Sequence, residues 1–342
     1  MSTLDAENPL ERFALASAAR ESLAAWTTGA QVLTLITTLR DRGWTKYLAE
    51  PRDLETLAEF SGLPPTRLAD ILSLLEANGI VRQQDGTVQL TRPFEALAAD
   101  DSYIGLDELL DHSEVMSRLI RTAAEGPGPL PLTEPDALVV ARALGGKATT
   151  VTRTLYEQSF LPKLPEVSEA IRAGRWLDVG CGVAGATLTL ATLLPEFRAV
   201  AIELVPTVAA ETLRRVKEHG VADRVDVRCM DARDFDEPAS FSGAFWAQPF
   251  FPEPTRAATL AVILRSLKPG GVLVLQEMEP PEPDESDRPA YALRKLVAQG
   301  QEVPFARSAE DLAAEAVAAG FELVRLAPTD FGRMILVRRP LS

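Results

Sequence analysis

The spacing of hydrophobic residues predicts helices in the first part of the chain. Apolar side chains recur at helical intervals over residues 10–42, and we expect breaks at Gly29 and Gly43. A short helix follows, with Asp53 as its N-cap and Gly62 at its end.

The next segments complete a small domain. Residues 66–78 have one apolar helical face, and residues 80–84 and 87–91 alternate in polarity around Asp85-Gly86. That dipeptide between two such runs is a strong hairpin signal. Two helices followed by a hairpin predict a winged helix-turn-helix domain over residues 1–100.

Later residues change their rhythm. Residues 101–172 are mostly helical, are interrupted by the proline and glycine cluster at 126–131, and are expected to form a connector that lines a substrate pocket. From residue 173 to residue 342, strands and helices alternate, which predicts an α/β fold with a doubly wound, Rossmann-like parallel sheet. The expected strands are Trp176–Val179, Ala199–Glu203, Val225–Cys229, Gly243–Ala247, Val272–Gln276, Glu322–Leu326 and Met334–Val337, and the expected helices are 185–194, 207–219, 255–267 and 309–319.

The charge of the chain argues against nucleic-acid binding. The 342 residues carry a net charge of −14, and residues 1–100 have nine Lys and Arg against fourteen Asp and Glu. The helix that would read DNA offers Arg67 beside Asp70 and Glu76. Because nucleic acids and anionic lipids are bound by cations, we expect a role in protein–protein contact for this domain.

Cysteine and histidine are scarce. Cys181, Cys229, His112 and His219 are too few for a disulfide scaffold or a Cys/His zinc site, although a carboxylate-only metal site stays open. The chain has no run of eighteen apolar residues, and its first residues lack the blocks of a signal peptide. We expect a soluble, cytoplasmic protein.

A glycine-rich turn follows the first strand of the α/β region. Gly180, Gly182 and Gly185 have the spacing G-x-G-x-x-G between a strand and a helix, which is where nucleotide-type ligands bind. Asp178 lies just before them and would repel a pyrophosphate but attract an ammonium or sulfonium group. We therefore expect S-adenosylmethionine, which has both cations and no phosphate, rather than a nicotinamide cofactor.

Two further carboxylates follow later strands. Glu203 ends the second strand, where an acidic side chain can accept hydrogen bonds from ribose hydroxyls. Asp231 follows the third strand, where its carboxylate can accept from an adenine amino group. Because the carboxyl ends of parallel strands meet at one edge of a sheet, we expect both side chains near the glycine turn.

These segments resemble the ordered motifs of class I S-adenosylmethionine-dependent methyltransferases, on the strength of Leu177–Gly182, Glu203, Asp231-Ala232 and Lys268–Gly271. The N-terminal half is similar to the dimerising winged-helix domain of small-molecule O-methyltransferases. The resemblance implies a homodimer, a small organic acceptor of secondary metabolism and S-adenosylhomocysteine as a product. It implies cofactor contacts from Asp178, Gly180, Cys181, Gly182, Gly185, Glu203, Leu204, Asp231, Ala232 and Trp246.

One segment departs from that family. Related O-methyltransferases often have a catalytic His-Asp pair after the fourth strand, where this chain has Phe245–Glu253 without any histidine. The acceptor can be ionised already, as a carboxylate is near neutrality, and we favour this O-methylation. Alternatively, it is an amine or an acidic carbon, because Gln248–Phe251 faintly resembles the Asn/Asp-Pro-Pro-Tyr/Phe turn of N-methylating enzymes. In a third alternative, the base comes from the helical connector.

His112 is the candidate base in that connector. It shares a helical flank with Leu109 and Met116, and a histidine packed in the core or at the surface is the alternative. His219 precedes Gly220 at a helix end, where we expect it at the surface. The expected substrate contacts are Tyr103, His112, Met116, Tyr156, Gln248, Phe250 and Phe251, and Glu277 and Glu279 are further polar candidates.

Two other functions stay open. A regulatory protein could sense the adenosyl ligand through the winged helix, although its acidic helix disfavours this. An enzyme could instead use the cofactor for a cyclisation or rearrangement, which the absence of the usual base favours. Fold-level similarity does not separate these functions from methyl transfer.

Overall fold

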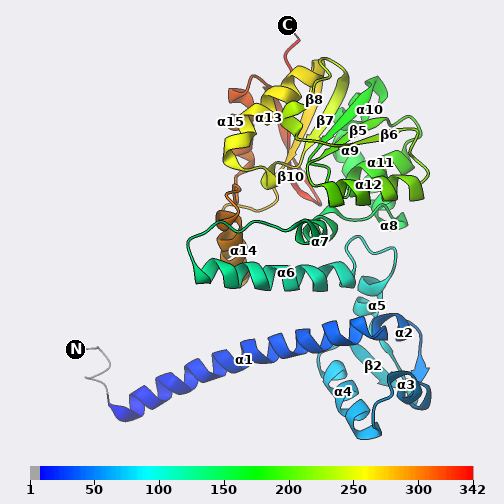
Figure 1. The fold of residues 1–342 in the computed structure, drawn as a ribbon, viewed down its shortest axis with the longest axis vertical. Coiled ribbons are helices and arrows are strands. Elements are labelled where there is room, and N and C mark those ends of the chain that lie inside the picture. The colour runs from blue at the N-terminus through cyan, green and yellow to red at the C-terminus, as the bar shows by residue number, and fades with distance from the viewer. Residues whose placement is uncertain (1–7, 342) are drawn as a thin grey trace. The chain divides into compact units, whose positions relative to one another are not determined.

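The computed structural model describes residues 8–341. The chain divides into two compact units, and the boundary lies between Ala99 and Asp100 in the sequence (Figure 1). The first unit is mostly helical and has a three-stranded sheet of order β1-β3-β2. Its elements are α1 (Pro9–Asp41), α2 (Trp44–Tyr47), β1 (Arg52–Asp53), α3 (Leu54–Ser61), α4 (Pro65–Ala77), β2 (Val81–Gln84), β3 (Thr87–Leu90) and α5 (Arg92–Ala98).

The predicted break at Gly29 is wrong, because α1 continues through it to Asp41. An interior glycine costs a helix about 1 kcal/mol, which a long helix tolerates. Nothing lies within 4 Å of where a Gly29 side chain would be, so no close contact requires a glycine there. The predicted break at Gly43 is confirmed, since its φ of +80° ends the helical path.

The winged-helix arrangement is confirmed in the remainder of this unit. Asp53 caps α3 by accepting a hydrogen bond from the Thr56 amide, and β2 pairs with β3 around the predicted turn. Leu57, Leu72 and Val88 come together in the core of this unit, where each buried side chain of this size contributes about 1.5–3 kcal/mol.

The second unit contains a seven-stranded sheet of order β6-β5-β4-β7-β8-β10-β9 with helices on both faces (Figure 1). Neighbouring strands are parallel from β6 to β8, and β10 is antiparallel to both β8 and β9. The strands are β4 (Arg175–Val179), β5 (Ala199–Glu203), β6 (Val225–Cys229), β7 (Phe241–Trp246), β8 (Leu267–Gln276), β9 (Glu322–Thr329) and β10 (Gly332–Arg338). The Rossmann-like prediction is therefore confirmed.

The helices of this unit include the predicted connector. The helices of the connector pack against helices of the α/β region, so the connector and the α/β region belong to one compact unit. They are α6 (Leu106–Glu125), α7 (Glu134–Gly145), α8 (Thr150–Leu155), a π-helical turn (Tyr156–Phe160), α9 (Leu161–Lys163) and α10 (Pro165–Ala173). The later helices are α11 (Gly185–Leu193), α12 (Pro206–Glu218), α13 (Glu253–Ser266), α14 (Arg288–Gly300) and α15 (Ala309–Ala318).

Helix α14 has no counterpart among the elements predicted from the sequence. Its buried residue Val297 packs with Val115 and Leu119 of α6 and with Leu130, which follows that helix, in a small hydrophobic cluster. No helix in the described residues is long and apolar enough to cross a membrane.

Candidate active site

The glycine turn connects β4 to α11 at the carboxyl edge of the sheet. Gly180 has a φ of +72°, a conformation that glycine adopts without strain, and a Cβ there would lie 2.7 Å from the Phe251 ring. Gly185 begins α11, and a Cβ at this position would overlap the carbonyl oxygen of Gly145. The turn therefore brings its backbone close to two neighbouring segments.

Asp178 lies at the end of β4 and is only 4% exposed. Its carboxylate accepts a hydrogen bond of 2.6 Å from the Thr187 hydroxyl. Burial raises the pKa of Asp178 to about 6, the Thr187 hydrogen bond opposes this shift, and the nearby Glu203 adds to it. A buried carboxylate without a cationic partner is costly, so a cation bound beside it gains a strong interaction.

Glu203 ends β5 and supports the glycine turn directly. One carboxylate oxygen accepts from the Gly182 amide at 3.0 Å and the other from the Val205 amide at 2.9 Å. Burial raises the pKa of Glu203. Each oxygen retains a further lone pair, so the carboxylate can still accept hydrogen bonds from ligand hydroxyls.

Asp231 follows β6 and is held by the side chain of Arg233. The Arg233 Nη2 lies 2.7 Å from an Asp231 oxygen, and the Arg233 amide donates to the same carboxylate at 2.9 Å. The guanidinium lowers the pKa of Asp231, which keeps this carboxylate ionised.

These segments border a cavity of about 660 Å³ in the second unit, a size typical of small-molecule sites. The structure brings most of the predicted site residues together around it. Those that line the cavity are Asp178, Gly180, Cys181, Gly182, Gly185, Glu203, Leu204, Asp231, Ala232, Trp246, Tyr103, Tyr156, Phe250 and Phe251.

His112 and Met116 do not line this cavity, contrary to the prediction from the sequence. Both belong to α6, which packs against α7 and α14, and Met116 contacts the small cluster that contains Val297. Helix α7 contributes residues to the cavity wall instead. Burial lowers the pKa of His112, which favours its neutral form.

Gln248 is also outside the cavity lining, and its side chain is buried and hydrogen-bonded within the protein. Its side-chain oxygen accepts from Arg256 at 3.0 Å, and its amide nitrogen donates to the Gln276 carbonyl at 3.2 Å. Arg256 additionally forms hydrogen bonds of 2.7 and 2.6 Å with Glu315.

Glu277 and Glu279 form ion pairs and are not among the cavity-lining residues. Glu277 accepts two hydrogen bonds of 2.7 Å from Arg333, which lowers the pKa of its carboxyl group. Glu279 pairs with Arg294 at 2.6 Å. Their carboxylates therefore have structural partners.

An aromatic cluster forms one side of the cavity. Tyr156 and Phe160 come from the π-helical turn, with ring centroids 4.8 Å apart, and Phe331 follows at 5.7 Å from Tyr156. Tyr103 lies 6.1 Å from Phe331. Burial raises the pKa of Tyr156, so its phenol stays protonated at neutral pH.

Several lining residues have no individual signal in the sequence. Phe331 comes from the turn between β9 and β10, far along the chain from the glycine turn. The remaining apolar lining includes Leu130, Leu132, Val140, Ala141, Leu144, Met278 and Val303. Helical spacing does predict that Val140 and Leu144 share a face of α7, but not that this face meets the site.

Comparison with known proteins agrees with this geometry. Residues 177–271 match the methyltransferase domain family. A carboxy-S-adenosyl-L-methionine synthase of Chromohalobacter salexigens is 34% identical over 103 residues, which is 29% of this chain and 38% of that protein. The match therefore spans well under half of the curated relative's length.

Solved structures extend the similarity to nearly the whole chain. The mitomycin 7-O-methyltransferase is 21% identical, with 96% of this chain and 99% of that chain covered and a TM-score of 0.67. Human N-acetylserotonin methyltransferase in complex with S-adenosylmethionine is 16% identical, with 99% and 100% covered and a TM-score of 0.69. At these identities the likeness shows the fold.

Residues 177–271 of the second unit are therefore identified as a methyltransferase domain. S-adenosylmethionine is its cofactor, and the residues of the site fit that molecule. Three carboxylates, from Asp178, Glu203 and Asp231, line the cavity. These anionic groups suit the two cationic groups and two ribose hydroxyls of S-adenosylmethionine, and they would repel a phosphate. Within the described part of the methyltransferase domain, the indole nitrogen of Trp246 is buried with no hydrogen-bond partner.

Proposed function

We propose that this protein transfers a methyl group from S-adenosylmethionine to an oxygen atom of a small, largely apolar acceptor, in secondary metabolism. One observation carries the proposal: the cavity lined by Asp178, Glu203 and Asp231 also has a largely apolar lining with several aromatic rings. Such a cavity can hold the cofactor and an acceptor next to each other, and positioning supplies much of the catalysis of a displacement reaction.

The charges around the cavity restrict the acceptor. Among the described lining residues, the charged side chains are Asp178, Glu203, Asp231 and Arg233, and Arg233 is paired with Asp231. An acceptor with an additional charged group would bury that charge without a partner. We therefore propose a neutral body whose only ionised atom is the one that attacks.

The nature of the attacking atom follows from the missing base. No imidazole of the described residues lines the cavity, so an acceptor with a high pKa would have no histidine to remove its proton. A carboxylate, or a hydroxyl on an electron-poor ring, ionises without help near neutrality. We favour the carboxylate.

The chain's own residues contribute charge and water exclusion. When bound, S-adenosylmethionine supplies an electrophilic methyl group on a sulfonium. The Asp178 carboxylate stabilises the cationic part of that molecule, and the rings of Tyr156 and Phe331 keep water from the acceptor.

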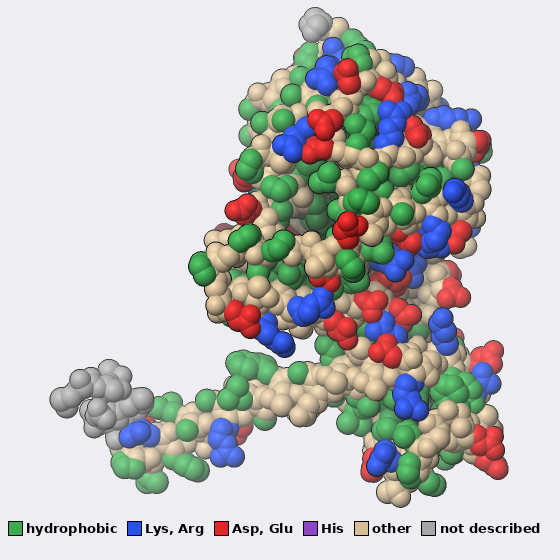
Figure 2. All heavy atoms as spheres, viewed as in Figure 1, with side chains coloured by type: hydrophobic (Ala, Val, Ile, Leu, Met, Phe, Trp, Pro, Cys, Tyr) green, Lys and Arg blue, Asp and Glu red, His purple; other side chains and the backbone are tan. Residues whose placement is uncertain are grey.

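We further propose that the protein is a homodimer through its N-terminal domain, residues 1–100. Hydrophobic side chains lie at the surface along helix α1 (Figure 2). Phe13 of this helix is 67% exposed and Trp26 is 70% exposed. Exposed apolar surface of this extent marks an interaction site, and a second copy is the simplest occupant. Light scattering at micromolar concentration should give twice the 37.0 kDa chain mass, and a monomer would contradict this proposal.

Product chemistry tests the function directly. The protein is incubated with methyl-labelled S-adenosylmethionine and matched aromatic acceptors that carry a carboxylate, a hydroxyl or an amine. We expect labelled methyl ester, which mild base hydrolyses, whereas methyl ethers and N-methyl products resist this treatment. A stable labelled product would contradict carboxylate methylation.

A neutral amine is the second candidate, because it also attacks without a general base. The same experiment identifies it by a base-stable product. The curated relative is a synthase of a modified S-adenosylmethionine, so the cofactor itself is also measured by mass spectrometry. Formation of S-adenosylhomocysteine together with a methylated acceptor supports the proposal, and a modified cofactor without methylated acceptor contradicts it.

A further inference from the structure

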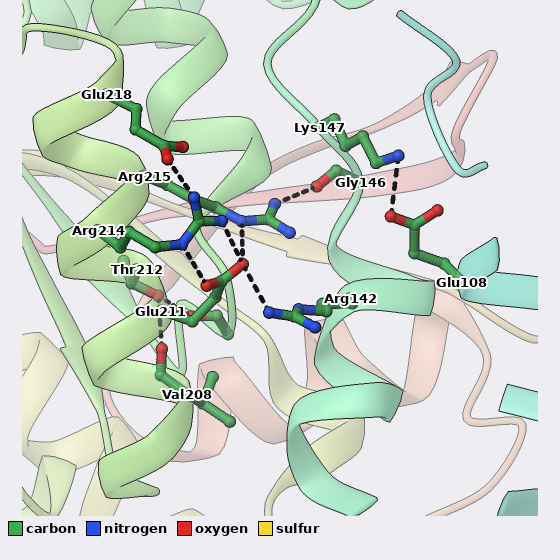
Figure 3. Close-up of polar contacts among 11 residues, drawn as sticks. Glu108, Arg142, Gly146, Lys147, Val208, Glu211, Thr212, Arg214, Arg215 and Glu218 are labelled. Atoms are coloured by element: carbon green, nitrogen blue, oxygen red, sulfur yellow. Dashed lines mark hydrogen bonds and ion pairs between the residues drawn. The ribbon is translucent and has the colours of Figure 1, made fainter. Parts of the chain in front are cut away.

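Helix α12 has a charged cluster whose role the adenosyl site does not explain. Its centre is Glu211, which is only 7% exposed. Figure 3 shows the Glu211 carboxylate between the guanidinium groups of Arg214, Arg215 and Arg142. Arg214 donates two hydrogen bonds of 2.8 and 2.9 Å, Arg215 donates one of 3.0 Å, and Arg142 pairs at 3.2 Å.

Two of these arginines tie α12 to the segment that forms the cavity wall. Arg142 belongs to α7, whose residues Ala141 and Leu144 line the cavity. Arg215 is buried and donates a hydrogen bond of 3.1 Å to the carbonyl oxygen of Gly146, just after α7. Glu211 therefore holds both connections from α12 to the end of α7.

The C-terminal end of α7 packs closely against the glycine turn. A Cβ on Gly185 would overlap the Gly145 carbonyl oxygen, and a Cβ on Gly145 would lie 2.7 Å from the Val183 side chain. Gly146 likewise packs against the ring of Tyr103, which lines the cavity. The position of the C-terminal end of α7 thus affects both the glycine turn and the lining of the cavity.

Helix α12 also contacts the glycine turn directly. The hydroxyl of Thr212, the residue after Glu211, donates to the Gly182 carbonyl oxygen at 2.6 Å. The amide of Gly182 in turn donates to Glu203. One turn of α12 therefore contacts the glycine turn through Thr212. The same turn contacts α7 and the residue after it through Glu211 and its arginines.

From these contacts we infer that Glu211 is a positioning residue, which seats the C-terminal end of α7 on the glycine turn and so couples the acceptor wall to the bound cofactor. Glu211 is not among the residues that line the cavity, and it acts through Arg142 and Arg215. The inference goes beyond the proposed function, and only its kinetic readout rests on that function.

Hydrogen exchange of the full chain tests the inference, with S-adenosylhomocysteine as the probe ligand. In the wild type, we expect the ligand to slow exchange of the α7 amides. Glu211→Gln should raise the α7 exchange rate on the order of tenfold and remove most of the ligand's effect there, while β4 and β5 keep their protection. With an accepted substrate, KM of the acceptor should rise about tenfold while kcat changes less than threefold.

Glu218→Gln is the matched control. Glu218 is on the same helix and is half exposed, and its ion-pair partner is Arg214 of that helix rather than a residue of α7. We expect it to leave α7 exchange and the acceptor KM unchanged. Because Glu211→Gln leaves Arg215 buried with a weaker partner, Arg142→Gln provides a second variant that removes only the α7 side of the cluster and should show the same α7 pattern.

Three outcomes would overturn the inference: unchanged α7 exchange in both test variants, a uniform rise across the whole unit, or an equal effect of Glu218→Gln. A wild type that shows the ligand effect on α7 but methylates no acceptor would refute the proposed function and leave the role of Glu211 standing.

Discussion

The guanidinium of Arg256 lies over the indole ring of Trp246, with its central carbon 4.7 Å from the ring centroid. Arg256 is 1% exposed, and its hydrogen bonds join Gln248 of the turn after β7 to Glu315 of α15. A buried cation held by a carboxylate, a carbonyl and an aromatic face thus fixes the segment from which Trp246 enters the cavity.

Removing this cation should destabilise the fold. We expect Arg256→Met to lower the free energy of unfolding by about 3 kcal/mol, because it leaves Glu315 and the Gln248 carbonyl without their donor. Arg265→Met on the same helix, where the side chain is half exposed, should cost less than about 1 kcal/mol. Urea unfolding measures both, and equal losses would contradict the role given to Arg256.

Asp178 makes the stability of the cofactor-free protein depend on pH. Its pKa in the folded state is about 6, above the value of about 3.9 in an unfolded chain, so the folded state holds this proton more tightly. The resulting stabilisation is fully present below about pH 4 and is lost as pH rises through 6. Cofactor affinity changes in the opposite direction, because the cationic ligand requires the ionised carboxylate.

Asp178→Asn separates these two effects. Without cofactor at pH 7, the variant should be more stable than the wild type by about 1–2 kcal/mol, since no charge is buried. It should bind S-adenosylhomocysteine at least about a hundredfold more weakly, which thermal shift and calorimetry measure. The exposed Asp223→Asn serves as control and should change neither property. A destabilised variant, or one with normal affinity, would contradict the assigned role.

Two glycines should respond to the same substitution with opposite sign. Gly29→Ala in α1 meets no atom within 4 Å and should stabilise the first unit by about 0.5–1 kcal/mol. Gly185→Ala would place its methyl group on the Gly145 carbonyl oxygen, so we expect it to destabilise the second unit and weaken cofactor binding. Thermal unfolding and calorimetry compare the two variants, and a neutral Gly185→Ala would show that α7 does not rest tightly on the turn.

The cofactor residues are predictable from the sequence because local signals define them. Asp178 and Glu203 end buried strands, and the glycine spacing between them specifies a turn into a helix, so parallel pairing alone brings them to one edge of the sheet. The acceptor residues depend on which helix covers that edge. His112 has the correct spacing for an inward face, yet α6 directs its packing toward α7 and α14.

Gln248 illustrates the same limit. Its place after β7 suggests a site residue, but its side chain is hydrogen-bonded to the buried Arg256 of α13 and does not line the cavity. Helix α14 is missed although Leu293, Val297 and Ala298 recur at helical spacing. Phe331 lies in the hairpin between β9 and β10, and only the assembled sheet brings it beside Tyr156. Contacts between distant segments, rather than local pattern, decide these positions.

His112 belongs to α6 and lies outside the cavity lining. We expect His112→Ala to retain activity within about threefold of the wild type, and Asp178→Asn to lose far more through its loss of cofactor. Because a carboxylate acceptor is fully ionised above pH 6, the wild-type rate with saturating cofactor should vary little between pH 6 and 8. A rate that rises tenfold per pH unit toward a plateau near a histidine pKa, together with an inactive His112→Ala variant of normal cofactor affinity, would contradict this prediction. Those two results would require α6 to move and bring the imidazole to the acceptor, and a hydroxyl or an acidic carbon would then be the better acceptor.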